Sequence, residues 1–397
     1  MVSETFEVKI DRVAAGGTVG RLDDGRVVFV RHAIPGEKVR VTLTQERSRF
    51  TRGDASEVLS PSTHRVKAPC AYSHPGGCGG CDLQHVAPEF QLRWKADVVK
   101  EQFQRLAHLD VEVDVKSVGP ALSSRTRLRC GVDEDGRLGL RQHGSDEIVP
   151  LAGCHVFSVR GNEAFMNDWE GAREVEIRAI GDSSFAVVTL EDGSVVTSTL
   201  DGLIDEEPQR SYVEVNGERF RVSALSFWQA HEAAPEILTK EVVELSKVRR
   251  GGRVVDLFSG VGLFTVPLAR RVGTDGRVIA VESSSSSAAD ARRNVADLPY
   301  VTVVEQRVTP RLIRDTVDGG TVVVLDPPRS GAGIPVMEAL AHARPERIVY
   351  VSCDAATLAR DCRVLVDAGW TLTQLRAFDL FPMTEHVELA AALDRPR

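Results

Sequence analysis

The 397-residue chain is predicted to be an α/β protein whose C-terminal domain is built on a mostly parallel sheet, with two β-rich domains before it. Three patterns predict this fold class. The first sixty residues alternate short apolar runs with Gly and Pro turn signals, as small β-barrels do. Short strands return between Val111 and Ser223, which favours an antiparallel sheet. From about Ala224 onward, strands alternate with helical segments, which is typical of a parallel sheet.

Residues 1–62 are predicted to form the barrel, with strands that include Phe6–Ile10, Val27–Val30 and Val39–Leu43. Several cations and an aromatic residue would then lie at strand ends or in loops, a mixture that proteins use to bind single-stranded nucleic acids. The set is Arg31, His32, Arg47, Arg49, Phe50 and Arg52. The same residues could equally be a solvated polar face.

Residues 63–223 are predicted to form a central antiparallel β domain. Its strands include Thr126–Cys130, Val175–Ala179, Phe185–Leu190 and Tyr212–Val215. One helix interrupts this pattern, because apolar residues recur at helical spacing between Glu89 and Leu106. This helix could pack on the C-terminal domain.

Residues 224–397 are predicted to form the parallel sheet. Its strands are Arg253–Asp256, Val278–Val281, Val301–Val304, Thr321–Leu325 and Ile348–Val351, followed by a hairpin of Thr371–Phe378 and His386–Ala391. Such continuous apolar runs indicate strands that are covered on both faces.

A glycine-rich loop, Asp256-Leu-Phe-Ser-Gly260-Val-Gly262, follows the first of these strands and opens a helix. Glycines let a ligand approach the backbone closely, and a helix start offers unpaired N–H groups. Glu282 ends the second strand, where an acid can accept hydrogen bonds from both hydroxyls of a ribose. Dinucleotide loops carry a third glycine, but here Thr265 takes its place. The loop resembles instead the S-adenosylmethionine loop of class I methyltransferases.

Cys353 directly follows the apolar run that ends at Val351. A buried cysteine is often only a packing residue. At the carboxyl end of a strand, however, it lies in the crevice where open α/β sheets bind ligands, and it is placed for nucleophilic attack. Asp326, in Asp326-Pro-Pro-Arg329, and Glu388, in His386-Val-Glu388, favour the catalytic interpretation.

Six motifs in order make the chain resemble the RNA (uracil-C5)-methyltransferase family, which installs 5-methyluridine in tRNA or 23S rRNA. They are Cys78-Gly-Gly-Cys81-Asp-Leu-Gln84-His85, Phe227-Trp-Gln229, the loop Asp256–Gly262, Asp326-Pro-Pro-Arg-Ser-Gly331, Val351-Ser-Cys353 with Thr357–Asp361, and Phe381–Glu388. The resemblance covers nearly the whole chain. It implies a TRAM-like (OB-like) RNA-binding barrel, a cysteine-bearing central domain and a Rossmann-like methyltransferase domain.

The resemblance also implies a role for each site residue. Cys353 would add to C6 of uracil, and Glu388 would remove the C5 proton after methyl transfer. Asp326 would contact the cofactor and the target base, while Gln229 and Phe258 fall at cofactor-contact positions. The alternative is a noncatalytic RNA-binding protein that retains the fold, and the sequence leaves both tRNA and 23S rRNA as substrates.

Four of the seven cysteines match the family's metal ligands: Cys70, Cys78, Cys81 and Cys154. Four cysteines can hold either tetrahedral zinc or an iron–sulfur cluster. The resemblance favours a [4Fe-4S] cluster over zinc. It leaves Cys130 and Cys362 as packing residues.

The chain departs from the family pattern at several positions. Asp354-Ala355 replaces the usual Asn-Pro after the nucleophile, and a carboxylate beside a thiol should raise the thiol pKa unless it points away or is paired. Leu263, Arg307 and Met383 also differ from the common residues, which leaves the cofactor contacts near Leu263 and Arg307 open.

Composition restricts where the chain works. No segment approaches the roughly 20 apolar residues that a membrane helix needs, and the N-terminus carries no secretion signal, so we expect a cytoplasmic protein. In that reducing compartment, cysteines are more typical of metal binding or catalysis than of disulfides. The net charge of -8 does not favour RNA, although residues 1–68 have 12 Lys and Arg against 9 Asp and Glu. We expect a monomer.

Overall fold

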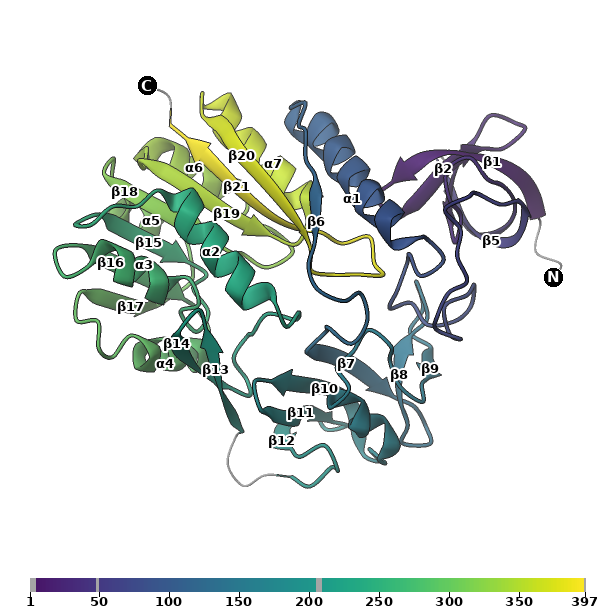
Figure 1. The fold of residues 1–397 in the computed structure, drawn as a ribbon, viewed down its shortest axis with the longest axis horizontal. Coiled ribbons are helices and arrows are strands. Elements are labelled where there is room, and N and C mark those ends of the chain that lie inside the picture. Colours follow the sequence, from purple (N-terminus) through teal and green to yellow (C-terminus); the bar gives the residue numbers. More distant parts are fainter. Residues whose placement is uncertain (1–4, 48–49, 205–208, 396–397) are drawn as a thin grey trace.

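The computed structural model describes residues 5–47, 50–204 and 209–395. It contains a closed barrel, a six-stranded sheet, a two-stranded hairpin and an eight-stranded sheet with helices (Figure 1). This architecture confirms the predicted α/β class with two preceding β-rich parts. Within the described ranges, no helix combines the length and the apolar character that crossing a membrane requires.

The N-terminal barrel closes in the order β1-β2-β3-β5-β4. Its strands are β1 (Thr5–Ala14), β2 (Gly17–Arg21), β3 (Val27–Arg31), β4 (Lys38–Glu46) and β5 (Thr51–Ser60). Alternate residues point inward, so that Val8, Ile10, Val28, Val30 and Val39 share one buried core. The alternating apolar residues in the sequence are therefore the ones that point into the barrel core.

The central sheet is antiparallel and has the order β12-β11-β10-β7-β8-β9. Its strands are β7 (Arg127–Val132), β8 (Leu138–Arg141), β9 (Ile148–Pro150), β10 (Ala172–Ile180), β11 (Ser183–Leu190) and β12 (Val195–Ser198). A short 3₁₀ helix at Gly161–Met166 precedes β10. Leu128, Phe157, Trp169, Val175 and Ile177 belong to the core of this sheet.

Two segments that precede residue 224 pack on the C-terminal domain. Helix α1 (Pro88–Gln102) continues into a wider helical turn at Phe103–Ala107, and Val99 and Phe103 lie in the same buried cluster as Tyr350. The short strand β6 (Val115–Ser117) pairs with the edge of the C-terminal sheet. The hairpin of β13 (Arg210–Val215) and β14 (Glu218–Ser223) packs against helix α4 (Ser285–Asn294), and Phe220 joins the C-terminal core.

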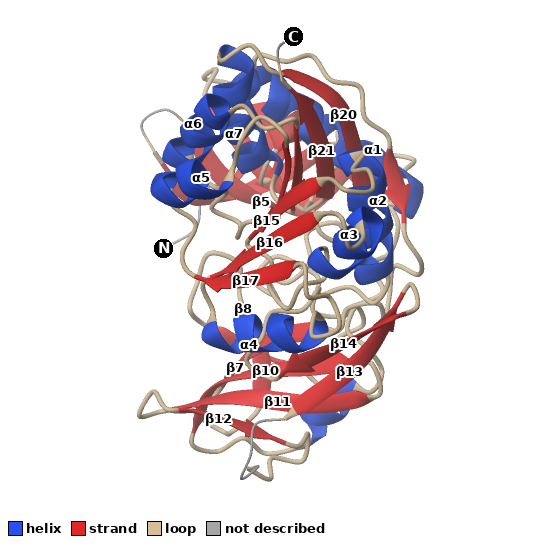
Figure 2. Cartoon of the chain, turned by 90° about the vertical axis from the view of Figure 1, so that its left-hand side faces the viewer, coloured by secondary structure: helices blue, strands red, loops and turns tan. Residues whose placement is uncertain are grey.

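The C-terminal sheet has the order β17-β16-β15-β18-β19-β21-β20-β6. Its further strands are β15 (Arg253–Leu257), β16 (Arg277–Glu282), β17 (Val301–Glu305), β18 (Thr321–Leu325), β19 (Arg347–Ser352), β20 (Thr371–Asp379) and β21 (Glu388–Asp394). The helices are α2 (Ala234–Ser246), α3 (Thr265–Val272), α4 (Ser285–Asn294), α5 (Pro310–Thr316), α6 (Ile334–Ala343) and α7 (Ala355–Asp367). Helices α5, α6 and α7 cover one face and α2 and α3 the other (Figure 2).

The strand order creates the crevice in which the site lies. The chain builds β15, β16 and β17 outward on one side and then crosses to β18 on the other, and open sheets bind ligands at such a switch point. Strands β15, β18 and β19 are parallel, whereas β21 runs antiparallel to β19. The first residue of β21 therefore lies at the same edge of the sheet as the last residues of β18 and β19.

Candidate active site

Three predicted catalytic residues come from three strands that meet at one edge of the sheet. Asp326 follows β18, Cys353 follows β19, and Glu388 opens β21. Their positions follow from the register, because Leu325 pairs with Tyr350 and Ser352 pairs with Leu389. Residues far apart in the sequence are thus brought together by strand ends alone.

The electrostatics of this group favour the uncharged forms. The pKa of Cys353 is raised to about 12, mainly by burial and also by the charges of Glu388 and Asp326. Burial also raises the pKa of Glu388 well above its ordinary value, followed by the charge of Asp326. Negative charges repel one another, so the ionisation of one of these side chains makes ionisation of its neighbours less favourable.

Arg329 supplies the opposing positive charge. It is exposed, yet its guanidinium lowers the pKa of both Cys353 and Glu388. No role was predicted for this residue from the sequence, although it stands in the same motif as Asp326. The sequence feature that could have revealed it is a cation three residues after an acid at the end of a strand.

Asp354 does not act on the neighbouring thiol in the way that the sequence suggested. Its carboxylate accepts a hydrogen bond from the N–H of Thr357 at 2.8 Å and caps helix α7. The pKa of Cys353 is raised by burial, Glu388 and Asp326 rather than by Asp354. The carboxylate of Asp354 is therefore paired, and in that case it was not expected to raise the pKa of the thiol.

The loop after β15 has a backbone conformation that is open to the close approach of a ligand. Phe258, Gly260 and Gly262 have φ angles of 61°, 55° and 91°, a region that residues with side chains rarely occupy. The carboxylate of Glu282 accepts a hydrogen bond from the N–H of Gly260 at 2.9 Å, and another from the N–H of Ser284 at 2.7 Å. Glu282 thus holds the backbone of the loop in place and lies at its edge.

Asp256 lies beneath this loop rather than on its surface. Its side chain is fully buried and accepts a hydrogen bond from the hydroxyl of Thr265, while its Oδ1 has no hydrogen-bond partner in the described part of the chain. Burial raises the pKa of Asp256 to about 7. Leu263 is buried in the core, whereas Arg307 is exposed after β17.

Gln229 reaches the candidate catalytic group from the segment after β14. Its side-chain nitrogen donates a hydrogen bond to Asp326 at 3.2 Å. Two residues earlier, Phe227 is half exposed, with the guanidinium of Arg127 centred 5.4 Å from its ring. This exposed aromatic residue lies close to Gln229 in the chain, and no role was predicted for it from the sequence.

The four predicted metal-binding cysteines, Cys70, Cys78, Cys81 and Cys154, line one cavity. The N–H of Gly80 donates to the sulfur of Cys78 at 3.3 Å. Among the described residues, however, the structure has no group of three or more Cys, His, Asp or Glu that could hold a metal ion.

Comparison with known proteins identifies the family. A model described as tRNA (Uracil-5-)-methyltransferase matches residues 311–396, and a TRAM domain model matches residues 1–56. A protein-L-isoaspartate(D-aspartate) O-methyltransferase model matches residues 203–324, across the cofactor loop. An uncharacterized RNA methyltransferase of Streptomyces avermitilis is 39% identical over 427 residues, which cover 99% of both chains.

A relative with a stated activity is the 23S rRNA (uracil(1939)-C(5))-methyltransferase RlmD of Acinetobacter baylyi. It is 32% identical over 417 residues, covering 94% of this chain and 89% of that one. The chain belongs to the RNA (uracil-C5)-methyltransferase family. Membership favours an S-adenosylmethionine-dependent enzyme over a noncatalytic RNA-binding protein.

A solved structure of the family has the same fold. The Pyrococcus abyssi tRNA (uracil-54, C5)-methyltransferase, in complex with S-adenosyl-L-homocysteine, superposes with a TM-score of 0.72 at 23% identity. The match covers 97% of this chain and 100% of that one. The class I methyltransferase fold predicted for this uracil-C5 methyltransferase is therefore confirmed.

The structure brings together only some of the barrel residues that were predicted to bind nucleic acid. The guanidinium of Arg52 lies 5.7 Å from the ring centre of Phe50 and 5.9 Å from that of Phe29. The nearest carboxylate oxygen of Asp54 is 3.9 Å from Arg31, and Arg49 lies outside the described residues. A cation stacked on two aromatic rings is the part that suits unpaired bases.

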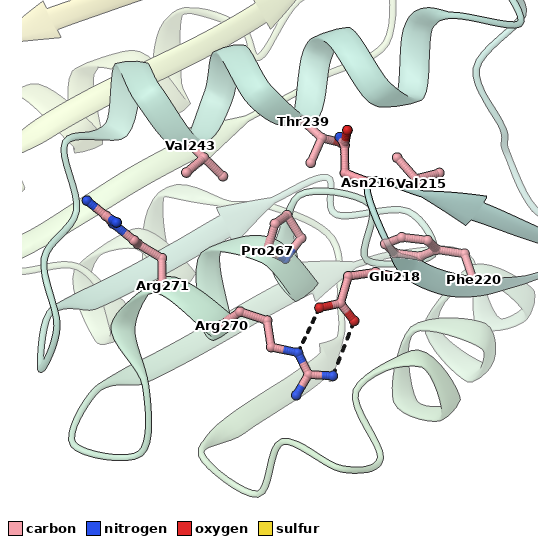
Figure 3. Close-up of a pocket in the computed structure, with 9 residues that line it drawn as sticks. All are labelled: Val215, Asn216, Glu218, Phe220, Thr239, Val243, Pro267, Arg270 and Arg271. Atoms are coloured by element: carbon pink, nitrogen blue, oxygen red, sulfur yellow. Dashed lines mark hydrogen bonds and ion pairs between the residues drawn. The ribbon is translucent and has the colours of Figure 1, made fainter.

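A separate recess of about 310 Å³ opens between the β13–β14 hairpin, α2 and α3 (Figure 3). Its lining contains none of the predicted site residues. Its Arg270 is paired with Glu218 at 2.9 Å and with Asp297 at 2.7 Å, so that this positive charge is already balanced. The recess is therefore separate from the candidate site at the strand ends.

Proposed function

We propose that the chain methylates C5 of a uridine in tRNA or 23S rRNA through a covalent bond between Cys353 and C6 of the uracil ring. Glu388 removes the C5 proton. The observation that supports this proposal is the meeting of Cys353, Asp326 and Glu388 at one sheet edge, beside the glycine loop.

Uracil C5 is a weak nucleophile, and the thiolate of Cys353 changes that. A new bond from the sulfur to C6 moves the C5–C6 electron pair onto C5 and the adjacent carbonyl. S-adenosylmethionine, when bound, would supply the electrophilic methyl group, which forms a bond to C5 as its bond to the sulfonium sulfur breaks and S-adenosylhomocysteine leaves. The Glu388 carboxylate then takes the C5 proton, the C5–C6 double bond forms again, and the bond from C6 to sulfur breaks. A positioned base of this kind is typically worth about 10²- to 10⁴-fold in rate.

The charges of the site fit this order of events. The thiolate is required before the addition, whereas the Glu388 carboxylate is required after it. Because the charge of Glu388 raises the pKa of Cys353, the thiolate forms more readily while Glu388 is protonated. The adduct carries sulfur as a neutral thioether, so that the ionised Glu388 is less opposed in the second half of the reaction.

The residues around the loop suit a methyl donor with a ribose and an adenine. The set that would hold S-adenosylmethionine is Gln229, Asp256, Phe258, Gly260, Gly262, Glu282 and Asp326. Of these, Asp256 would act indirectly by supporting the loop, because its side chain is buried beneath the loop and hydrogen-bonded to Thr265. Asp326 would border both the donor and the uracil.

Labelled S-adenosylmethionine with total tRNA or 23S rRNA tests the proposal, followed by digestion to nucleosides. We expect label in 5-methyluridine, first with 23S rRNA, since the relative from Acinetobacter baylyi is named for that substrate. Cys353→Ala should give no product, whereas Glu388→Gln should accumulate a covalent protein–RNA complex on a denaturing gel. Normal product from Cys353→Ala would overturn the mechanism.

We further propose that Cys70, Cys78, Cys81 and Cys154 hold a [4Fe-4S] cluster. A cluster binds each thiolate through a different iron, so its ligands surround a cavity, whereas zinc needs four sulfurs around one ion. The four cysteines of this chain line a cavity. Anaerobically purified protein should contain iron and sulfide and absorb visible light, and Cys81→Ser should lose the iron. Stoichiometric zinc in colourless protein would contradict this assignment.

A further inference from the structure

The segment from Asp379 to Glu388 joins β20 to β21 and ends on the proposed base. Between those two strand residues it contains no helix or strand, and its Met383 has a φ of 65°. Residues with side chains rarely adopt this conformation, and they keep it only where their surroundings enforce it. The shape of the segment, and with it the approach to Glu388, must therefore be held from outside.

Gln91 of helix α1 holds the middle of the segment. This side chain is buried, and its Oε1 accepts a hydrogen bond from the N–H of Met383 at 3.2 Å. Its Nε2 lies 3.0 Å from the carbonyl oxygen of Leu83 and 2.9 Å from that of Val86. One amide thus joins Met383 to the segment that follows Cys81.

The segment after Cys81 closes the other side of Met383. The N–H groups of Asp82 and Leu83 both donate to the carbonyl oxygen of Met383, each at 2.9 Å. The N–H of Glu385 also donates to the Asp82 carboxylate at 3.4 Å. Both polar backbone groups of Met383 are therefore bound, which explains how its unfavourable φ angle is maintained.

Lys95 holds the beginning of the segment. It lies four residues after Gln91, on the same face of helix α1. Its fully buried ammonium group pairs with the Asp379 carboxylate and donates to the carbonyl oxygen of Phe381 at 2.9 Å. Two side chains of one helix thus bind three points of a segment that lies about 290 residues further along the chain.

We propose that Gln91 and Lys95 are positioning residues that set Glu388 for removal of the C5 proton. This inference rests on the proposed function. Cys353 is placed by β19 and α7, so that a looser segment should leave adduct formation intact and slow only the breakdown of the adduct. A misplacement of about 1 Å in a catalytic group can cost about 10²-fold in rate.

Two variants test the inference. Gln91→Met keeps the side-chain length and removes the amide. Lys95→Met alone would leave the Asp379 carboxylate buried without its partner, so it is combined with Asp379→Asn, which removes both charges. Leu340→Ala is the control for lost core packing, because Leu340 is fully buried on α6 in the same core cluster as Val99 of helix α1 and forms none of the polar contacts described above.

For Gln91→Met and the double variant we expect kcat to fall by about 10-fold or more, the KM for S-adenosylmethionine to change little, and covalent RNA adduct to accumulate. RNA with deuterium at uracil C5 should give a larger isotope effect on kcat than in the unmodified enzyme. Leu340→Ala should lower the melting temperature without accumulating adduct.

Normal kcat, or a lower kcat without adduct, in both folded variants would overturn the inference and leave the two residues a structural role only. Glu388→Gln separates this result from failure of the proposed function. If Glu388→Gln accumulates adduct and the α1 variants do not, only the positioning role fails. If Glu388→Gln turns over normally, the proposed base itself is wrong.

Discussion

The carboxylate of Asp354 accepts a hydrogen bond from the N–H of Thr357 at 2.8 Å and caps the helix that begins directly after the proposed nucleophile. Asparagine caps helices as well as aspartate does. Asp354→Asn should therefore leave both the stability and the pH profile of methyl transfer nearly unchanged. Asp354→Ala should lower the free energy of unfolding by about 1 kcal/mol, measured by urea denaturation. A large acid-ward shift of the pH profile in Asp354→Asn would show that its charge does act on the thiol.

Arg329 should set the pH range in which Cys353 reacts. Its guanidinium lowers the pKa of the thiol, so Arg329→Gln should raise that pKa and move the alkylation profile of Cys353 to higher pH by up to about one unit. The rate is measured with iodoacetamide and mass spectrometry of the Cys353 peptide. Arg363→Gln is the control, because Arg363 pairs with Asp367 on the same helix. Superimposed profiles for the Arg329 variant and the unmodified enzyme would refute this role.

Asp256 should make the cofactor-free protein less stable as the pH rises. Its pKa is raised by burial to about 7, so that the folded state binds a proton more tightly than the unfolded state. The stability from this group is complete below the unfolded pKa near 4 and is lost as the pH rises to 7. Between pH 5 and 7, the free energy of unfolding of the unmodified protein should fall by up to about 2 kcal/mol because of this group. Asp256→Asn should not show this fall. Parallel curves of unfolding free energy against pH for the two proteins would contradict this account.

Glu282 should contribute to binding of the methyl donor. It holds Gly260 through a hydrogen bond of 2.9 Å, so Glu282→Gln should weaken S-adenosylmethionine binding by about 10-fold in calorimetry, a loss of about one strong hydrogen bond. Glu305→Gln is a close control, because Glu305 pairs with Glu282 in the strand register but forms an exposed ion pair with Arg292. Equal affinities for both variants would argue against the assignment.

Strand periodicity made the sheet and its edge predictable. Cys353, Asp326 and Glu388 stand at the ends of apolar runs, and strand ends meet at the crevice whatever the rest of the fold. The predicted start of the last strand at His386 is two residues early, since β21 begins at Glu388. Local pattern cannot place this boundary, because the preceding residues are shaped by helix α1 and not by the sheet.

Contacts over long sequence distances were not predictable in the same way. The sequence pattern placed α1 in the central region while allowing it to pack on the C-terminal domain, which the structure confirms. It gave no sign that β6 pairs with the edge of the C-terminal sheet. The Asp354 cap and the Gln91 contact with Met383 also depend on where a side chain points. A pattern of residue types carries no direction of this kind.

The most direct test of the central claim is mass spectrometry of the enzyme after reaction with RNA that carries 5-fluorouridine at the target position. Fluorine cannot leave C5 as a proton does, so the account predicts a peptide with Cys353 covalently bound to a methylated fluorouridine. No modified Cys353 peptide, together with normal 5-methyluridine formation by Cys353→Ala on ordinary RNA, would contradict it.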